Sequence, residues 1–158
     1  MGLTYQAEQT MTVTNLHSLA TSPTAGWQSA VVDNTGNLYF DYQVQVVLAF
    51  ANTAPGTSRC AYVFVYSGNS SVYTNPVTGS EGTLTLPDVT ANPLALKPLG
   101  IIPYVTQNET VESEVFSVCQ ALGLVVAPPS WGIAIINHSG AALAASGSTA
   151  KYRGVLIS

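Results

Sequence analysis

The residues best suited to acid–base or nucleophilic chemistry are few and widely separated in this chain. His17 and His138 are its two histidines, and Ser139 directly follows the second. A serine triad needs a histidine that hydrogen-bonds both the nucleophile and an orienting acid. Neighbouring residues of an extended chain point to opposite faces, which separates His138 from Ser139. The sequence also lacks a G-x-S-x-G elbow, so we interpret His138 as a turn residue.

Paired carboxylates are the second chemistry to consider, because two facing acids hydrolyse glycosides. Glu112 and Glu114 share a face if their segment is extended, and Asp41 lies on the polar face of a long alternating segment. The other acids fall mostly in expected turns, namely Asp33, Glu81, Asp88 and Glu109. Catalytic acid pairs normally lie in an aromatic-lined cleft, which this pattern does not indicate. The sequence therefore predicts a protein that is not an enzyme.

Two oxygen-rich turns have the residue types of a Ca²⁺ site, which accepts carboxylate, amide and carbonyl oxygens. They are VDNTGN at residues 32–37 and NHSG at residues 137–140. Both lack the acid density of a tight site, and Asn and Gly suit turn backbone without any metal. Cys60 and Cys119 lie in apolar runs without further ligands at zinc spacing. We expect buried thiols, leave a disulfide open, and predict no catalytic, metal-binding or cofactor-binding residue.

Aromatic side chains offer a third possibility, a platform on which a glycan stacks. The candidates are Trp27, Trp131, Tyr62, Tyr66, Tyr73 and Tyr104. Binding requires several of them to be exposed together, whereas alternation along strands favours a place in the core. Glycosylation sequons at Asn69, Asn108 and Asn137 carry no prediction without a secretory signal.

The elements that must position these residues are strands. Residues 40–50 alternate between apolar and polar side chains, which is typical of a half-buried strand. Residues 59–67 are β-branched and aromatic, and the turn-like NTAPGTS lies between the two segments. This arrangement predicts a β-hairpin. In the strand expected at residues 131–136, apolar side chains occur on both faces, so we expect it to be covered on both sides.

The remaining segments are short strands separated by turn signals, and no long helical period competes with them. Residues 88–100 read as a proline-interrupted linker, and residues 114–122 as a strand. The fold class predicted is all-β, a single-domain antiparallel β-sandwich or jelly roll of about eight strands. The domain spans residues 15–158, and residues 1–14 form an N-terminal arm or edge strand.

Composition excludes several partners. Charged residues make up 8% of the chain, against roughly 25% in typical soluble proteins. Four basic residues and a net charge of −4 exclude phosphate-neutralising nucleic-acid binding and an anionic membrane surface. The longest apolar run, residues 46–51, is far shorter than the about 20 residues of a spanning helix. The first residues lack a secretory signal, so we expect synthesis in a cytoplasm.

Three stretches resemble a family of small structural proteins encoded in tailed-phage genomes. They are GWQSAVVDNTGNLYFDYQVQV from Gly26, AYVFVYSG from Ala61, and PPSWGIAIINHSGAALAASGSTAKYRG from Pro128. We associate this family with jelly-roll head-decoration, or cement, proteins. The likeness covers most of the chain from about Thr21 onward and carries no catalytic or cofactor residue.

The resemblance implies a non-enzymatic virion protein, made in the host cytoplasm, that binds the outer head surface and stabilises the capsid. Its implied partners are the major capsid protein and further copies of itself, with a trimer favoured over a dimer. The alternative that the same fold leaves open is a tail- or fibre-associated carbohydrate- or receptor-binding β-sandwich module.

Overall fold

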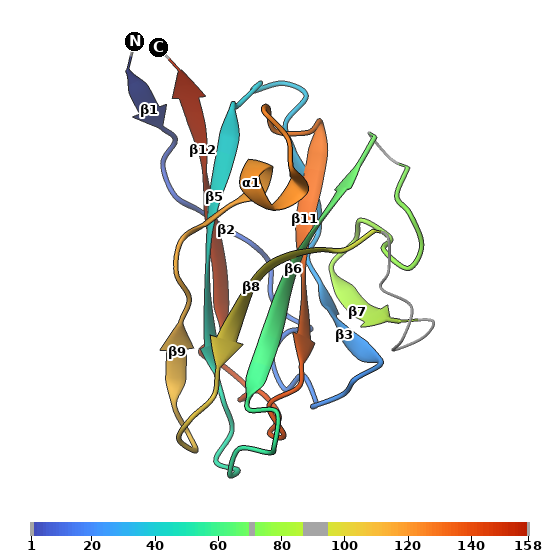
Figure 1. The fold of residues 1–158 in the computed structure, drawn as a ribbon, viewed down its shortest axis with the longest axis vertical. Helices are drawn as coiled ribbons and strands as arrows, with labels where there is room; N and C mark the ends of the chain where they lie inside the picture. Colours follow the sequence, from blue (N-terminus) through green and yellow to red (C-terminus); the bar gives the residue numbers. More distant parts are fainter. Residues whose placement is uncertain (1, 70–71, 87–94, 158) are drawn as a thin grey trace.

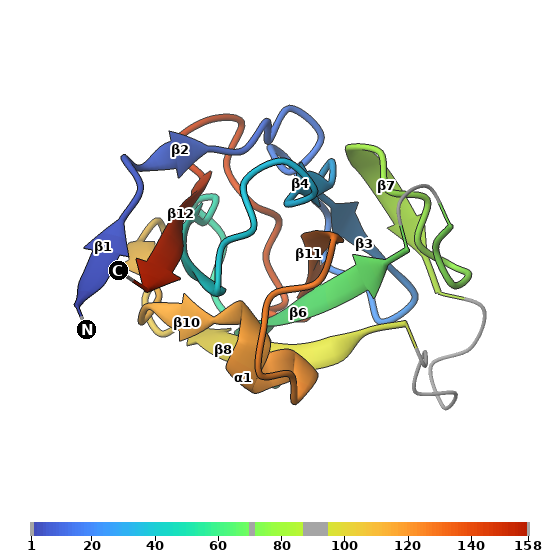
Figure 2. The ribbon, with the colours of Figure 1, turned by 90° about the horizontal axis from the view of Figure 1, so that it is seen from above.

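Two antiparallel sheets of six strands each pack face to face in this computed structural model (Figures 1 and 2), which describes residues 2–69, 72–86 and 95–157. The predicted all-β, antiparallel β-sandwich is thereby confirmed. The first sheet contains β1 (Leu3–Tyr5), β2 (Gln9–Thr10), β5 (Asp41–Ala49), β9 (Thr110–Glu112), β10 (Phe116–Ser117) and β12 (Thr149–Ile157). The second contains β3 (Ala25–Gln28), β4 (Val32–Asp33), β6 (Cys60–Gly68), β7 (Gly82–Thr85), β8 (Lys97–Pro103) and β11 (Ser130–Asn137).

The strand number differs from the prediction, because the described residues form twelve strands rather than about eight. Three of the additional strands, β2, β4 and β10, contain two residues each. Such segments are too short to show a period of two. They become strands only because a long neighbour, β12, β11 or β5, supplies the backbone partners.

The predicted hairpin of β5 and β6 is wrong, since the two strands belong to different sheets. β5 pairs with β12, whereas β6 pairs with β11 and β8. The connection from Phe50 to Arg59 crosses between the sheets and is fixed at both ends. The Phe50 ring stacks on Tyr104 with centroids 4.1 Å apart, and the Gly56 N–H donates to the Ser139 carbonyl at 2.7 Å.

β11 is the central strand of the second sheet, and all eight of its residues are buried. Trp131, Ile133 and Ile135 enter the main core between the sheets. Ala134 and Ile136 enter a second cluster on the opposite face of β11. That cluster contains Tyr66, Val77, Leu84, Leu86 and Leu96. The expectation of a strand covered on both sides is confirmed.

The segment before Asn15 runs along β12 at one edge of the first sheet. β1 pairs with Val155–Ile157 and β2 pairs with Lys151 and Tyr152. The strand residues of this segment are exposed, but Met11 is buried in the main core.

Only Phe116 and Ser117 of the strand predicted at residues 114–122 form a strand, and a short helix follows them. After β10, α1 (Val118–Leu122) begins at Ser117, whose hydroxyl accepts from the Gln120 N–H at 3.1 Å. It ends at Gly123, which has a left-handed φ of 68°. Ser and Gln three residues apart followed by Gly are helix start and stop signals. In the described part of the chain, no helix is long and apolar enough to cross a membrane.

Candidate functional site

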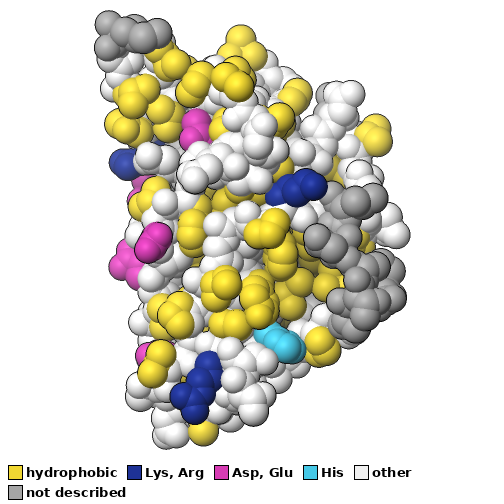
Figure 3. All heavy atoms as spheres, in the orientation of Figure 1, with side chains coloured by type: hydrophobic (Ala, Val, Ile, Leu, Met, Phe, Trp, Pro, Cys, Tyr) yellow, Lys and Arg dark blue, Asp and Glu magenta, His cyan; other side chains and the backbone are white. Residues whose placement is uncertain are grey.

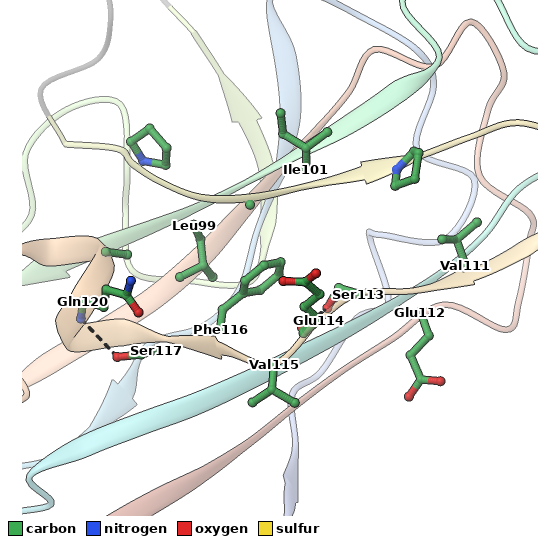
Figure 4. Close-up of a pocket in the computed structure, with 14 residues that line it drawn as sticks. Leu99, Ile101, Val111, Glu112, Ser113, Glu114, Val115, Phe116, Ser117 and Gln120 are labelled. Atoms are coloured by element: carbon green, nitrogen blue, oxygen red, sulfur yellow. Dashed lines mark hydrogen bonds between the residues drawn. The ribbon is translucent and has the colours of Figure 1, made fainter.

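A groove of about 960 Å³ runs along the side of the sandwich where an edge strand of each sheet meets the other (Figure 4). One wall is β8, the outermost strand of the second sheet, and the other is the segment from β9 to β10. We call it the β8 groove, and it is lined by residues 98–101, Pro103, residues 111–117, Gln120 and Ala121.

The outer edge of β8 is open toward this groove. The Tyr104 N–H donates to the Arg59 carbonyl at 2.8 Å, which sets the hydrogen-bonding register of β8 on β6. In an antiparallel ladder hydrogen-bonded pairs alternate, so the backbone N–H and C=O of Ile101 point away from β6. Pro98 and Pro103 near the two ends fit an edge strand, because proline cannot donate to a further strand.

The floor of the groove is apolar. Phe116 reaches across from β10 and covers Gly100, where an added Cβ would overlap the Phe116 ring. Leu99 also points into the groove, whereas Ile101 and Val115, which are 61% and 52% exposed, turn outward at its two rims (Figure 4). Exposed apolar surface of this kind marks sites that other molecules cover.

A second hollow, of about 520 Å³, continues from the groove over the outer face of β6. Tyr62 and Phe64 line it together with residues 98–101, and their rings lie 6.4 Å apart. Figure 3 shows hydrophobic side chains gathered over β6 and β8, on the face that the view presents. The two hollows therefore form one continuous apolar surface that shares the β8 wall.

The two carboxylates expected to share a face both line the β8 groove but point in different directions. In Figure 4, Glu114 turns toward Phe116 and Ser113, whereas Glu112 turns away from them. Among the described residues, neither carboxylate accepts a hydrogen bond or joins an ion pair. Ser113 follows β9 and interrupts the extended pattern on which the shared face depended. The pair does not converge on one point, as a glycosidase mechanism requires.

Asp41 belongs to the anchoring of α1. Its Oδ1 accepts from the Cys119 N–H at 2.9 Å, and its Oδ2 accepts from the Ser117 hydroxyl at 2.7 Å. The carboxylate thus satisfies the first turn of the helix, whose N–H groups have no partner within the helix.

The other described acids that the sequence placed in turns also have local roles. A hydrogen bond from the Thr35 N–H lowers the pKa of Asp33. Partial burial raises the pKa of Glu81, but bonds from Trp27 Nε1 and from Asn15 outweigh it and hold that pKa below its usual value. Glu109 accepts from the Val105 N–H, and Asp88 lies outside the described residues.

The histidines and Ser139 do not form a nucleophilic site. His17 Nε2 lies 3.2 Å from the Ser148 carbonyl, and the His138 ring packs 6.3 Å from the Tyr62 ring. Ser139 is fully buried, and its hydroxyl lies 2.7 Å from Asn137 Oδ1. The Asn137 Nδ2 donates to the Ala141 carbonyl at 2.7 Å. The polar residues of this segment therefore hold its turn.

The turn at residues 32–37 is organised by Asn34, which is 3% exposed. Its Oδ1 accepts from the Tyr39 N–H at 2.8 Å and from the Tyr42 hydroxyl at 2.9 Å. No group of three or more His, Cys, Asp and Glu side chains gathers as a metal site in the part of the chain that the structure describes.

Both cysteines are free thiols. The Cys119 Sγ donates to the Phe40 carbonyl at 3.3 Å. Burial, followed by the neighbouring Asp41 carboxylate, raises the pKa of this thiol to about 12.

The six aromatic candidates do not form a common platform. Four of them, Trp27, Trp131, Tyr66 and Tyr104, are fully buried. Tyr73 packs edge-on against Tyr66, with ring centroids 6.2 Å apart. Tyr62 alone contributes to the apolar surface, and its neighbour there, Phe64, was not among the candidates. Phe64, Ile101 and Val115 could not be identified from the sequence as surface residues, because apolar residues in predicted strands are normally assigned to the core.

Comparison with known proteins finds no matching family model, no matching curated protein and no matching solved structure. A functional proposal therefore depends on this apolar surface, on the composition, and on the resemblance carried by the three sequence stretches.

Proposed function

We propose that the protein is a non-enzymatic structural component of a tailed-phage virion, a jelly-roll decoration protein that binds the outer head surface and stabilises the capsid. The observation that carries the proposal is the continuous apolar surface over β6, β8 and the β8 groove. Such a surface suits a protein whose function is to bind another protein over a broad apolar contact.

The dispersed polar groups support a binding role over a catalytic one. Both histidines, Cys119 and the described turn carboxylates are engaged locally, and the two groove carboxylates diverge. A chain with 8% charged residues also has few ions to desolvate when its surface is buried. Repetition of a modest contact over many copies gives tight attachment through avidity.

The proposed partner is the major capsid protein, at the hollow over β6. Purified heads without this chain should bind the protein in co-sedimentation, and Phe64→Ser should weaken that binding. Leu38→Ser is the matched control, because Leu38 is 75% exposed and does not line the hollow. Unchanged attachment of a correctly folded Phe64→Ser protein would exclude this surface.

Placement in the virion has a direct test. Mass spectrometry of purified particles should find this chain in stoichiometric amounts, and cryo-electron microscopy should show its density on the head. Particles that lack the chain would refute the proposal, and density on the tail would favour the receptor-binding alternative.

One observation favours that carbohydrate-binding alternative, namely the adjacent Tyr62 and Phe64 rings. Among the described residues, no Asn, Asp or Gln side chain lines the hollow that could bond sugar hydroxyls. Specific glycan-array binding that is lost in Phe64→Ser would establish the alternative, whereas an array without hits would remove it.

A further inference from the structure

We infer that copies of this chain associate head to tail, with the ribbon formed by β1 and the end of β12 of one copy seated in the β8 groove of the next. The inference rests on the proposed function, in which the apolar surface is covered by other subunits, and it identifies a second copy as the partner at the groove.

The ribbon is another place where the described residues expose large apolar side chains. Leu3 pairs with Ile157 across β1 and β12, and these side chains are 60% and 41% exposed. Tyr5, on the same face as Leu3, is 45% exposed. In Figure 1 the ribbon projects at the upper left, away from the wall that β8 forms. A ribbon that buries so little of its own apolar surface gains from a groove on another copy.

The charges on the ribbon and in the β8 groove are complementary. The Arg153 guanidinium lies 4.6 Å above the Tyr5 ring centroid, and its Nε donates to Gln43 Oε1 at 2.8 Å. Among the described residues no carboxylate lies within ion-pair distance of Arg153, in contrast to Lys151, which binds Glu8 at 2.7 Å. The groove presents the complementary charge, because the Glu114 carboxylate has no partner among those residues.

The same charges disfavour two-fold contacts. Two grooves face to face would bring the Glu114 carboxylates of both copies together, and two ribbons would bring both Arg153 side chains together. Like charges across an interface are unfavourable, whereas ribbon against groove places opposite charges beside matching apolar residues. Because ribbon and groove are different surfaces, the contact is heterologous.

The backbone fits this pairing as well. β1 is the edge strand of the first sheet and β8 is the edge strand of the second. Each therefore has backbone groups on its outer side that an added strand can pair with. The outward N–H and C=O of Ile101 lie midway between the two prolines of β8, so neither proline blocks pairing at this position.

Charge reversal tests the contact. Sedimentation velocity of the wild-type protein should show association that Glu114→Arg and Arg153→Glu each weaken by about tenfold or more. The double variant E114R/R153E should recover it, because the pair is restored with opposite sign. Glu112→Arg is the matched control, since this carboxylate points away from Glu114 and should matter less. Failure of the double variant to recover association would overturn the assigned pair.

Mixing two disabled variants tests the head-to-tail arrangement. Ile101→Asp places a negative charge on the β8 wall of the groove and Leu3→Asp places one on the ribbon, both at exposed positions. Each variant alone should be monomeric, and the equimolar mixture should form a heterodimer that grows no further. A mixture that stays monomeric, or a wild-type protein that is monomeric at its highest soluble concentration, would overturn the inference.

The two proposals fail separately. Head binding by a chain that does not self-associate would remove this inference and leave the proposed function intact. If the chain is absent from virions but self-associates, and the double variant E114R/R153E recovers that association, the proposed function would be wrong and this inference would stand.

Discussion

Asn34→Ala should remove the hydrogen bonds that hold the turn between β4 and β5 and so destabilise the whole sandwich. Asn34 is 3% exposed and connects three parts of the chain. Its Oδ1 accepts from the Tyr39 N–H and the Tyr42 hydroxyl, and its Nδ2 lies 3.3 Å from the Tyr39 carbonyl and 3.4 Å from the Ala127 carbonyl. Alanine removes all four contacts at once.

The magnitude follows from the groups left behind. The Tyr39 N–H and the Tyr42 hydroxyl lose their acceptor in a buried place, at about 1–3 kcal/mol each. The two carbonyls lose longer bonds, and buried carbonyls tolerate this better than N–H groups. We expect a loss of about 3–5 kcal/mol in the free energy of unfolding. That is a large part of the roughly 5–15 kcal/mol of a typical domain.

Urea unfolding followed by circular dichroism measures this loss. Asn37→Ala is the matched control, because Asn37 lies in the same turn but is exposed, and it should change stability by less than about 0.5 kcal/mol. Equal effects of the two variants, or a loss below about 1 kcal/mol for Asn34→Ala, would refute the interpretation of Asn34 as the organiser of this turn.

Asn34→Asp adds a pH dependence to the same test. The carboxylate can still accept from Tyr39 and Tyr42 but cannot donate to the two carbonyls, and burial raises its pKa in the folded state. A folded-state pKa above the unfolded value means that the destabilisation is small below the unfolded pKa and grows as pH rises. Asn34→Asp should therefore be closer to wild type at about pH 4 than at about pH 7. The opposite trend would contradict the assigned burial.

Three further changes test other parts of the structure. Trp131→Ala and Phe50→Ala remove rings that are at most 1% exposed, and each should cost about 3–5 kcal/mol in urea unfolding, so unchanged midpoints would contradict the core assignment. Asp41→Ala should cost about 1–2 kcal/mol and quicken hydrogen exchange at the Cys119 amide, because the start of α1 loses its acceptor. With a thiol reagent at about pH 8, Cys60 should react in the folded protein while Cys119, with its pKa raised by burial to about 12, should react only on unfolding. Reaction in the reverse order would show that Cys119 is accessible.

The sequence predicts the long strands well, because their side chains report burial directly. The alternation along β5 matches its observed burial pattern, and the two apolar faces of β11 match its two clusters. It predicts the pairing of β5 with β6 wrongly, because a turn signal marks a change of direction without specifying the sheet. That choice depends on distant contacts, such as the stack of Phe50 on Tyr104.

The candidate site was harder to predict for a physical reason. Residues 97–100 belong to β8, although their proline suggested a linker, because proline is compatible with an edge strand that has no outer neighbour. Ile101 and Val115 have the residue types of a core, and only the arrangement of the two sheets leaves them exposed. The helix α1 was predictable in principle from Ser117, Gln120 and Gly123.

The edge strand β8 shows how a chain with few charges can still choose its partner. Natural sheet edges avoid indiscriminate pairing by means of prolines and charged side chains. Pro98 and Pro103 lie near the two ends of β8, and Glu114 lies across the groove. The centre, at Ile101, remains apolar and open. The prolines therefore limit strand pairing at the two ends of β8, and the acid disfavours a second copy's acidic groove. A short apolar strand that carries a positive charge can still pair at the centre. The ribbon with Arg153 meets that description, so we expect Arg153 and Glu114 to decide which surfaces of two copies can join.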